Sequence, residues 1–368
     1  MALITKSIGT TARDYSTITL WEAALGGAAG GAGNDALGEC YNDSVFDENP
    51  VINDTTPDSI TLSVASGERH DGTAGSGARI NSSTVPTSVI YGTSTKETIV
   101  EWLEVTAASG TDSLSSGGIA FSVSVGETFT ARYNLVHDID DACASGIAIQ
   151  GADATNGANV FDNIVYRIRR TVNSSRDKFG IRAQTARPVG VYNNTVYGVA
   201  HTNALASGNA TGIYVSDNAG KDNRNNIAMG TTVAGSGAAN DFDPTSPSNT
   251  TAGYNMSSDA TASDDGVTDN VLINKTSSDQ FVSIAVGSED LHLKNYSDAI
   301  DTATDLGTTP SGVEIDINGR DRDAQGDTWD IGAHEKVGGV PPSGGDGAGS
   351  RVASRAGSRF DNRFLERV

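Results

Sequence analysis

The chain has 368 residues, a formal net charge of −21, 43 glycines and only 9 prolines, and 19% of its residues are charged. This composition excludes a helical bundle or a coiled coil, which needs Ala, Glu, Lys and Leu in stripes of helical period. The acidity argues against a nucleic-acid partner, and no apolar run approaches the roughly 18 residues of a membrane span. The first ten residues lack a basic stretch followed by an apolar core, so no secretory signal is expected.

Residues 1–35 are predicted to form an N-terminal cap. One face of a short helix would carry Tyr15, Ile18, Trp21 and Leu25. Asp14 or Ser16 would cap the start of this helix, and Gly26 and Gly27 would end it. Trp21 is expected to cover the open end of the core that follows.

A two-part pattern repeats between residues 118 and 260. A Gly-Ile pair opens one apolar run, at Gly118, Gly146, Gly180 and Gly212. An asparagine opens a second run 14 to 17 residues later, at Asn134, Asn163, Asn194 and Asn226, with a fainter fifth at Asn255. Successive asparagines are 29, 31, 32 and 29 residues apart.

Short strands at this period predict an all-β, single-stranded parallel β-helix over residues 36–336, because isolated rungs must stack to bury their apolar faces. The repeated asparagine suits a tight corner in the left-handed region, and its amide can hydrogen-bond to the asparagines above and below it. About ten rungs would give a rod of roughly 50 Å. The alternative is that the asparagines begin ordinary hairpins of a β-sandwich.

Few residues have the pattern of a catalytic or metal site. Candidate catalytic carboxylates are Asp138, Asp140 and Asp141, one rung before Arg167, Arg169 and Arg170. Asp316, Asn318, Asp321 and Asp323 are candidate Ca²⁺ ligands, because their side-chain oxygens recur at nearly alternate positions. The same residues also fit a terminal turn. The five histidines are isolated in sequence, and no cofactor is predicted. Cys40 and Cys143 are expected to be free buried thiols, with a disulfide bridge between them as the alternative.

Three phrases near the C-terminus carry a resemblance: DLHLKNYSDAID at 290–301, DINGRDRD at 316–323 and WDIGAHE at 329–335. Together with DYSTITLWEAAL near the start, they resemble right-handed β-helix proteins of the pectate-lyase-like superfamily, and in particular the terminal segment of many bacterial and phage members. The resemblance implies the fold and no single activity. The chain lacks the Gly-His-Gly and Arg-x-Lys phrases of the pectin hydrolases.

The last residues differ in composition from the rest. A Gly/Pro/Ser-rich linker is predicted at 337–350 and a docking arm at 351–368, which has a net charge of +3. Every fourth residue of the arm is basic, and two phenylalanines lie among these positions. The predicted partner-binding residues are Arg351, Arg355, Arg359, Phe360, Arg363, Phe364 and Arg367.

These features predict a non-enzymatic structural protein on the surface of a phage particle. A capsid decoration protein is favoured, because phage tailspikes usually place a particle-binding domain before the β-helix. It would be a homo-oligomer, with trimers expected from the resemblance, and its arm would bind the major capsid or another virion protein. The alternatives are a tail spike or fibre component that binds host surface glycans, and a polysaccharide lyase or glycoside hydrolase.

Overall fold

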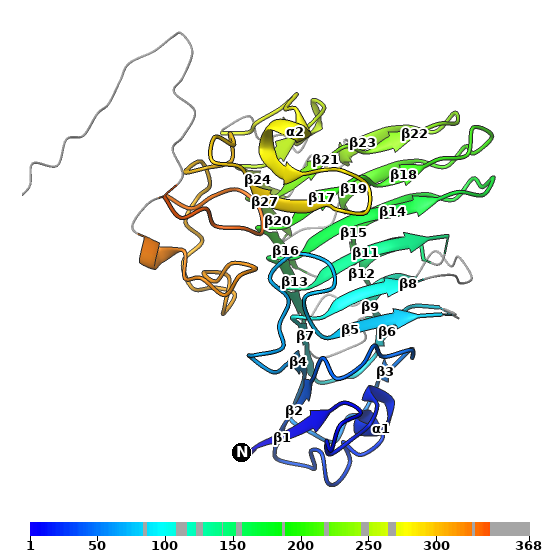
Figure 1. The fold of residues 1–368 in the computed structure, drawn as a ribbon, viewed down its shortest axis with the longest axis vertical. Coiled ribbons are helices and arrows are strands. Elements are labelled where there is room, and N and C mark those ends of the chain that lie inside the picture. Colours follow the sequence, from blue (N-terminus) through cyan, green and yellow to red (C-terminus); the bar gives the residue numbers. More distant parts are fainter. Residues whose placement is uncertain are drawn as a thin grey trace, which may run out of the picture.

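The computed structural model describes residues 1–83, 87–107, 116–122, 128–141, 143–151, 157–185, 188–216, 221–243, 250–263, 270–325 and 328–338. Three parallel sheets, which we name A, B and C, wind around one apolar core, and the rungs stack along the long axis in Figure 1. This confirms the predicted parallel β-solenoid. The predicted arm at 351–368 and the linker beyond residue 338 lie outside the described residues.

From residue 59 onward the strands follow one another in the order A, B, C along the chain, whereas the three strands before it belong to sheets A, A and C. Sheet A contains β1 (Leu3–Ile8), β2 (Asp35–Cys40), β4 (Ser59–Val64), β7 (Glu97–Glu101), β10 (Phe129–Arg132), β13 (Ala158–Phe161), β16 (Val189–Tyr192), β20 (Lys221–Arg224) and β24 (Thr250–Gly253). Sheet B contains β5 (Arg79–Ser82), β8 (Glu104–Ala107), β11 (Leu135–Asp140), β14 (Ile164–Arg170), β17 (Thr195–Tyr197), β21 (Ile227–Met229) and β25 (Met256–Ser257), with β18 (Ala200–His201) and β22 (Thr232–Val233) beside them. Sheet C contains β3 (Val51–Ile52), β6 (Ile90–Gly92), β9 (Gly117–Ser122), β12 (Ser145–Gly151), β15 (Lys178–Thr185), β19 (Ala210–Val215) and β23 (Ala239–Phe242).

The repeated Gly-Ile pair opens the strands of sheet C. The isoleucines of these pairs, together with Ile90 of the rung before them, pair in register through successive rungs and form one buried column: Ile90, Ile119, Ile147, Ile181 and Ile213. Three of the glycines, Gly118, Gly146 and Gly180, lie against valines of sheet B. A Cβ at Gly146 would come within 2.4 Å of Val165 Cγ1, and one at Gly180 within 2.4 Å of Val196 Cγ1. Only glycine therefore fits where the two sheets approach each other.

The repeated asparagine forms a buried ladder at the corner between sheets A and B. The Nδ2 of Asn134 donates to Asn163 Oδ1 at 3.0 Å, and the same bond continues from Asn163 to Asn194 at 3.0 Å. It continues through Asn226 to Asn255, so the predicted ladder is confirmed. The expectation that these asparagines occupy the left-handed region is wrong: the residue before each one does, as at Tyr133 (φ 55°). The chain turns at that preceding residue, which leaves the asparagine side chain pointing inward.

In the N-terminal cap Ile18, Trp21 and Leu25 are buried as predicted, but the helix starts later and ends earlier than expected, at Glu22 and not at Gly26 and Gly27. Helix α1 (Ile18–Glu22) begins after Thr17, whose hydroxyl accepts from the Leu20 N–H, so neither Asp14 nor Ser16 is the cap. Trp21 is buried against the first rungs, and a Cβ on Gly38 would lie 2.6 Å from its ring. Cys40 and Cys143 are both buried and not bridged.

The stack is shorter than predicted. Sheets B and C each run through seven successive strands, against about ten expected rungs. After β25 the chain stops coiling and folds back along the outside, where residues 270–325 and 328–338, the flank segment, lie beside sheets A and B (Figure 1). This segment contains α2 (Ser277–Gln280), an antiparallel pair formed by β26 (Phe281–Ser283) and β27 (Asp290–Leu293), and much irregular chain. In the part of the chain described, no helix has the length and hydrophobicity to cross a membrane.

Candidate functional site

The C-terminal phrases hold the flank segment to the corner between sheets A and B. Arg322 is fully buried and donates to Asp162 of that corner at 2.7 Å and to Glu335 at 2.9 Å. The carboxylates of Asp162 and Glu335 keep Arg322 charged against the opposing effect of burial, so its pKa is raised. Ala333 N–H donates to Thr195 Oγ1 at 3.0 Å on sheet B. Residues of the DINGRDRD and WDIGAHE phrases therefore build a clamp between the flank segment and the solenoid.

The three candidate carboxylates on β11 do not converge on one site. Asp140 forms a bidentate ion pair with Arg169 on the next rung: Nε donates to Oδ1 at 2.7 Å and Nη2 to Oδ2 at 2.6 Å. Asp141 accepts from the Thr171 N–H at 2.9 Å. Asp138 points instead toward His137 and Arg167. Arg170 is buried and donates to Ser174. The predicted proximity of acids and arginines across rungs is present, and it links neighbouring rungs.

The oxygens of the candidate Ca²⁺ ligands accept hydrogen bonds from neighbouring groups. Asp316 accepts from the backbone N–H groups of Asn318 and Arg320 with Oδ1 and of Glu335 with Oδ2. Asp321 accepts from the Asp323 N–H at 3.0 Å. Asp323 accepts from Trp329 Nε1 at 2.8 Å. Among the described residues no group of three His, Cys, Asp or Glu side chains is placed to hold a metal ion.

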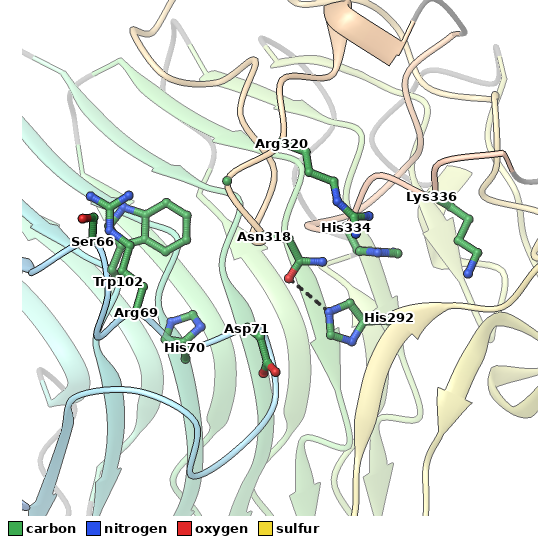
Figure 2. Close-up of a pocket in the computed structure, with 11 residues that line it drawn as sticks. Ser66, Arg69, His70, Asp71, Trp102, His292, Asn318, Arg320, His334 and Lys336 are labelled. Atoms are coloured by element: carbon green, nitrogen blue, oxygen red, sulfur yellow. Dashed lines mark hydrogen bonds between the residues drawn. The ribbon is translucent and has the colours of Figure 1, made fainter. Parts of the chain in front are cut away.

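A hollow of about 760 Å³ lies between the solenoid and the flank segment, and we call it the flank pocket. One wall comes from the connection after β4 and the corner after β7: Ser66, Arg69, His70, Asp71 and Trp102. The other wall comes from β27 and the chain that follows it: His292, Asn318, Arg320, His334 and Lys336. Figure 2 shows these two groups facing one another across the opening.

An aromatic stack holds the basic side chain of the first wall. Trp102, at φ 63°, stacks on Tyr133 of the next rung with ring centroids 4.5 Å apart. The guanidinium of Arg69 lies 4.4 Å from the centre of the Trp102 ring, a cation–π distance. The hydroxyl of Tyr133 hydrogen-bonds to the Gly312 carbonyl in the flank segment. Because Trp102 is buried beneath Arg69, its ring orients that cation and offers no free face to a ligand.

Hydrogen bonds fix the histidines of the second wall. His292 Nδ1 lies 2.5 Å from Asp290 Oδ1, and its Nε2 lies 3.3 Å from Asn318 Oδ1, the contact dashed in Figure 2. His334 Nδ1 accepts from the Leu293 N–H at 3.1 Å, which leaves its proton on Nε2. Burial and the nearby His292 lower the pKa of His334 to about 2, so this ring is neutral at physiological pH.

The flank pocket is basic within an acidic protein. Arg69, Arg320 and Lys336 line it, and none of them takes part in an ion pair among the described residues. The carboxylate of Asp71 also lines the pocket, but its Oδ1 accepts from Thr73 and Ser76. Burial lowers the pKa of His70 to about 4, so it adds no charge at neutral pH. Three cations without carboxylate partners are therefore available to an anionic ligand.

Of these pocket residues the sequence singled out Asn318, as a candidate Ca²⁺ ligand, and none as a ligand-binding residue of a pocket. Arg69 and Arg320 are 251 positions apart, and His70, His292 and His334 look isolated along the chain. The fold-back of the flank segment brings them together. A partial signal was present, because Asn318 lies inside the recognised DINGRDRD phrase.

No protein-family model matches the chain, and no curated protein sequence matches it. A solved structure described as the crystal structure of pectate lyase Pel9A is similar at 14% identity and a TM-score of 0.35, covering 91% of this chain and 96% of that one. Values this low support no statement about activity.

Proposed function

We propose that the protein binds an acidic glycan in the flank pocket. The observation that carries the proposal is the convergence of Arg69, Arg320 and Lys336, without acidic partners, in a chain of net charge −21. Elsewhere on the solenoid, arginines such as Arg13, Arg132 and Arg224 each pair with a carboxylate. Leaving three cations unneutralised around one hollow favours an anionic ligand there.

The other lining groups suit a carbohydrate. Ser66, Asn318 and His292 supply hydrogen-bond donors and acceptors for hydroxyl groups, while the cations would hold carboxylate or sulfate groups of the same molecule. A volume of about 760 Å³ falls within the usual range of ligand sites. This function corresponds to the glycan-binding alternative that the sequence left open. A nucleic acid would extend beyond the pocket and bring its phosphates against the acidic surface around it, which repels them, whereas a short oligosaccharide can lie within the pocket.

Calorimetry with oligosaccharides tests the proposal. Uronate-containing and sulfated oligosaccharides should bind, and neutral oligosaccharides of equal length should not. Arg69→Ala and Arg320→Ala should each weaken binding about tenfold, since each removes a charge-assisted hydrogen bond. Arg224→Ala is the matched control, because Arg224 is paired with Asp222 away from the pocket. Equal binding of neutral sugars, or equal losses in the control, would contradict the proposal.

The capsid-decoration function remains a proposal that rests on the arm at 351–368. Deleting residues 337–368 should abolish capsid binding and turn a trimer into a monomer in light scattering. A truncated chain that stays trimeric and still binds capsids would exclude the arm as the anchor. If the oligosaccharides are cleaved during the calorimetric experiment, the lyase or hydrolase alternative gains instead.

A further inference from the structure

A row of buried and partly buried charged side chains lies beside the flank pocket, and we call it the charge chain. Its members come from three adjacent strands of sheet B and from the flank segment: Glu104, His137, Asp138, Arg167 and Glu289. None of them lines the flank pocket. Each end of the row holds the backbone of one pocket wall.

The first end holds the connection between β4 and β5. Glu104 is fully buried, and its Oε2 accepts from the Gly75 N–H at 2.8 Å. Its Oε1 faces His137 Nε2 at 3.1 Å and Arg79 at 3.5 Å. The same connection carries Arg69 and Asp71 into the pocket. The conformation of this wall therefore depends on Glu104.

The middle of the row is His137, which lies between two carboxylates. Its Nδ1 is 2.7 Å from Asp138 Oδ2, while its Nε2 faces Glu104. Its ring stacks on Tyr166 of the next rung, with centroids 4.8 Å apart and planes 5° apart. An ionised carboxylate only accepts hydrogen bonds, and a neutral imidazole has one N–H. Only the protonated imidazolium satisfies both contacts.

The second end holds the chain that leads into β27. Asp138 pairs with Arg167, and Arg167 donates to both oxygens of Glu289 at 2.9 Å. Glu289 Oε2 accepts from the Gly287 N–H at 2.8 Å. Three residues after Glu289 comes His292, which lines the pocket. The two held loops face one another across a hollow of about 290 Å³ whose floor includes Tyr166 and Arg167.

We propose that the charge chain positions both walls of the flank pocket, with protonated His137 as the link that joins its two ends. His137 is thus a positioning residue for ligand binding. The inference rests on the proposed function only for the identity of the ligand. Loss of the His137 proton would loosen the loops at Gly75 and Gly287 together.

Charge balance within the row supports this role. The three carboxylates of the row meet Arg167 and His137 within it and Arg79 beside Glu104, so the row and Arg79 together are neutral only when His137 is protonated. Burial alone would lower the pKa of His137, but the hydrogen bonds to Asp138 and Glu104 outweigh burial and raise it. The charged and titratable groups that face this cluster are Arg79, Glu104, Asp138, Tyr166, Arg167, Glu289 and His70.

Amide hydrogen exchange tests the proposal without any ligand. In the full chain, the protection factors of the Gly75 and Gly287 amides should fall together, by about tenfold, as the pH rises through the titration of His137. In His137→Gln both amides should already be weakly protected at pH 6. Asp140→Asn is the matched control: it breaks an ion pair between the same two strands that reaches neither loop, and it should leave both amides unchanged.

Binding of a sulfated or uronate-containing oligosaccharide adds a second readout. His137→Gln should raise Kd several-fold and remove the part of the pH dependence that Asp140→Asn retains. The proposal is overturned if His137→Gln lowers the unfolding midpoint but leaves both amides and Kd as in the wild type. It is also overturned if wild-type protection at Gly75 and Gly287 does not change with pH, a result that requires no folded variant. If no oligosaccharide binds, the proposed function fails and the amides still decide the role of the charge chain.

Discussion

The solenoid rungs and the flank segment are held by different kinds of contact. Within the solenoid, the ladder asparagines bond to partners 29 to 32 residues away, and the same residue types recur at each step. The flank segment bonds to the solenoid through single contacts between residues far apart in the chain, such as Arg167 to Glu289, 122 residues apart, and Arg132 to the Ser311 carbonyl, 179 residues apart. None of these single contacts is repeated along the chain.

The contacts that stabilise the solenoid are therefore spread over many similar rungs, whereas the contacts that hold the flank segment are few. A rung shares its stability with the rungs above and below, so the loss of one residue is spread over similar neighbours. The flank segment depends on a few buried charged groups with no equivalent nearby. Because the flank pocket lies between the two regions, its geometry depends on the few buried charged contacts that hold the flank segment.

The largest effect is expected from Arg322→Leu. The substitution leaves Asp162 and Glu335 buried without their cation, which destabilises by about 3–5 kcal/mol in comparable buried pairs. Urea unfolding should show this loss, with the flank segment opening at lower denaturant than the rungs. A loss below about 1 kcal/mol would mean that the clamp is not what holds the flank segment.

A ladder substitution in the middle of the stack should have the next largest effect. Asn163→Ala removes the acceptor of Asn134 N–H and Nδ2, and it takes the side-chain donor away from the carbonyls of Ala131 and Phe161, of which Phe161 still accepts from the Tyr133 N–H. Unsatisfied buried groups of this kind cost about 1–3 kcal/mol each, reduced by local relaxation, so we expect a total of about 2–4 kcal/mol.

The matched comparison for the ladder is Asn255→Ala at its end. There the amide donates to the single carbonyl of Asn223, so the loss in urea unfolding should be smaller. Equal losses at the two positions would show that the ladder bonds are not what stabilises the corner.

The free energy of unfolding, measured against pH, tests the contribution of His137 in the charge chain. The folded pKa of His137 lies above its usual value, so its contribution to stability is complete below about pH 6.5 and is lost as the pH rises through the folded pKa. Burial raises the pKa of Asp330 to about 7, which also lowers stability as the pH rises toward neutrality. The wild type should therefore lose more stability than His137→Gln between pH 6 and 9. Parallel curves would show that His137 does not titrate in this range.

The smallest effect is expected from Asp140→Asn on the exposed side of sheet B. Asp140 and Arg169 are both about one-third exposed, and such surface ion pairs contribute about 0–1 kcal/mol. Urea unfolding and oligosaccharide binding should both match the wild type. A clear loss of binding would indicate that Asp140 takes part in ligand binding.

Much of the solenoid was predictable because its determinants are local. The Gly-Ile pairs and the asparagines recur once per rung, and stacking converts equal spacing into vertical alignment. Trp21 could be assigned to the cap because the apolar spacing around it is helical. The rung number was overestimated, since the length of the chain does not reveal that residues after β25 leave the stack.

The candidate site was not predictable in the same way. Asp138, Asp140 and Asp141 are neighbours in sequence, yet the strand is irregular here, with Asp138 and Asp141 both at positive φ, and each carboxylate has its own partners. The pocket cations have no common spacing and no shared motif. They meet only because the flank segment folds back.

The sequence by itself determined the parallel coil, the ladder and the capped start, because each depends on contacts between residues one rung apart. Only the tertiary structure decided the flank pocket and the charge chain beside it, because these depend on where one non-repeating segment comes to lie. That placement is set by buried ion pairs such as Arg322 with Asp162, 160 residues apart. A sequence repeat predicts the contacts that recur in every rung, and it carries no information about a contact that occurs once.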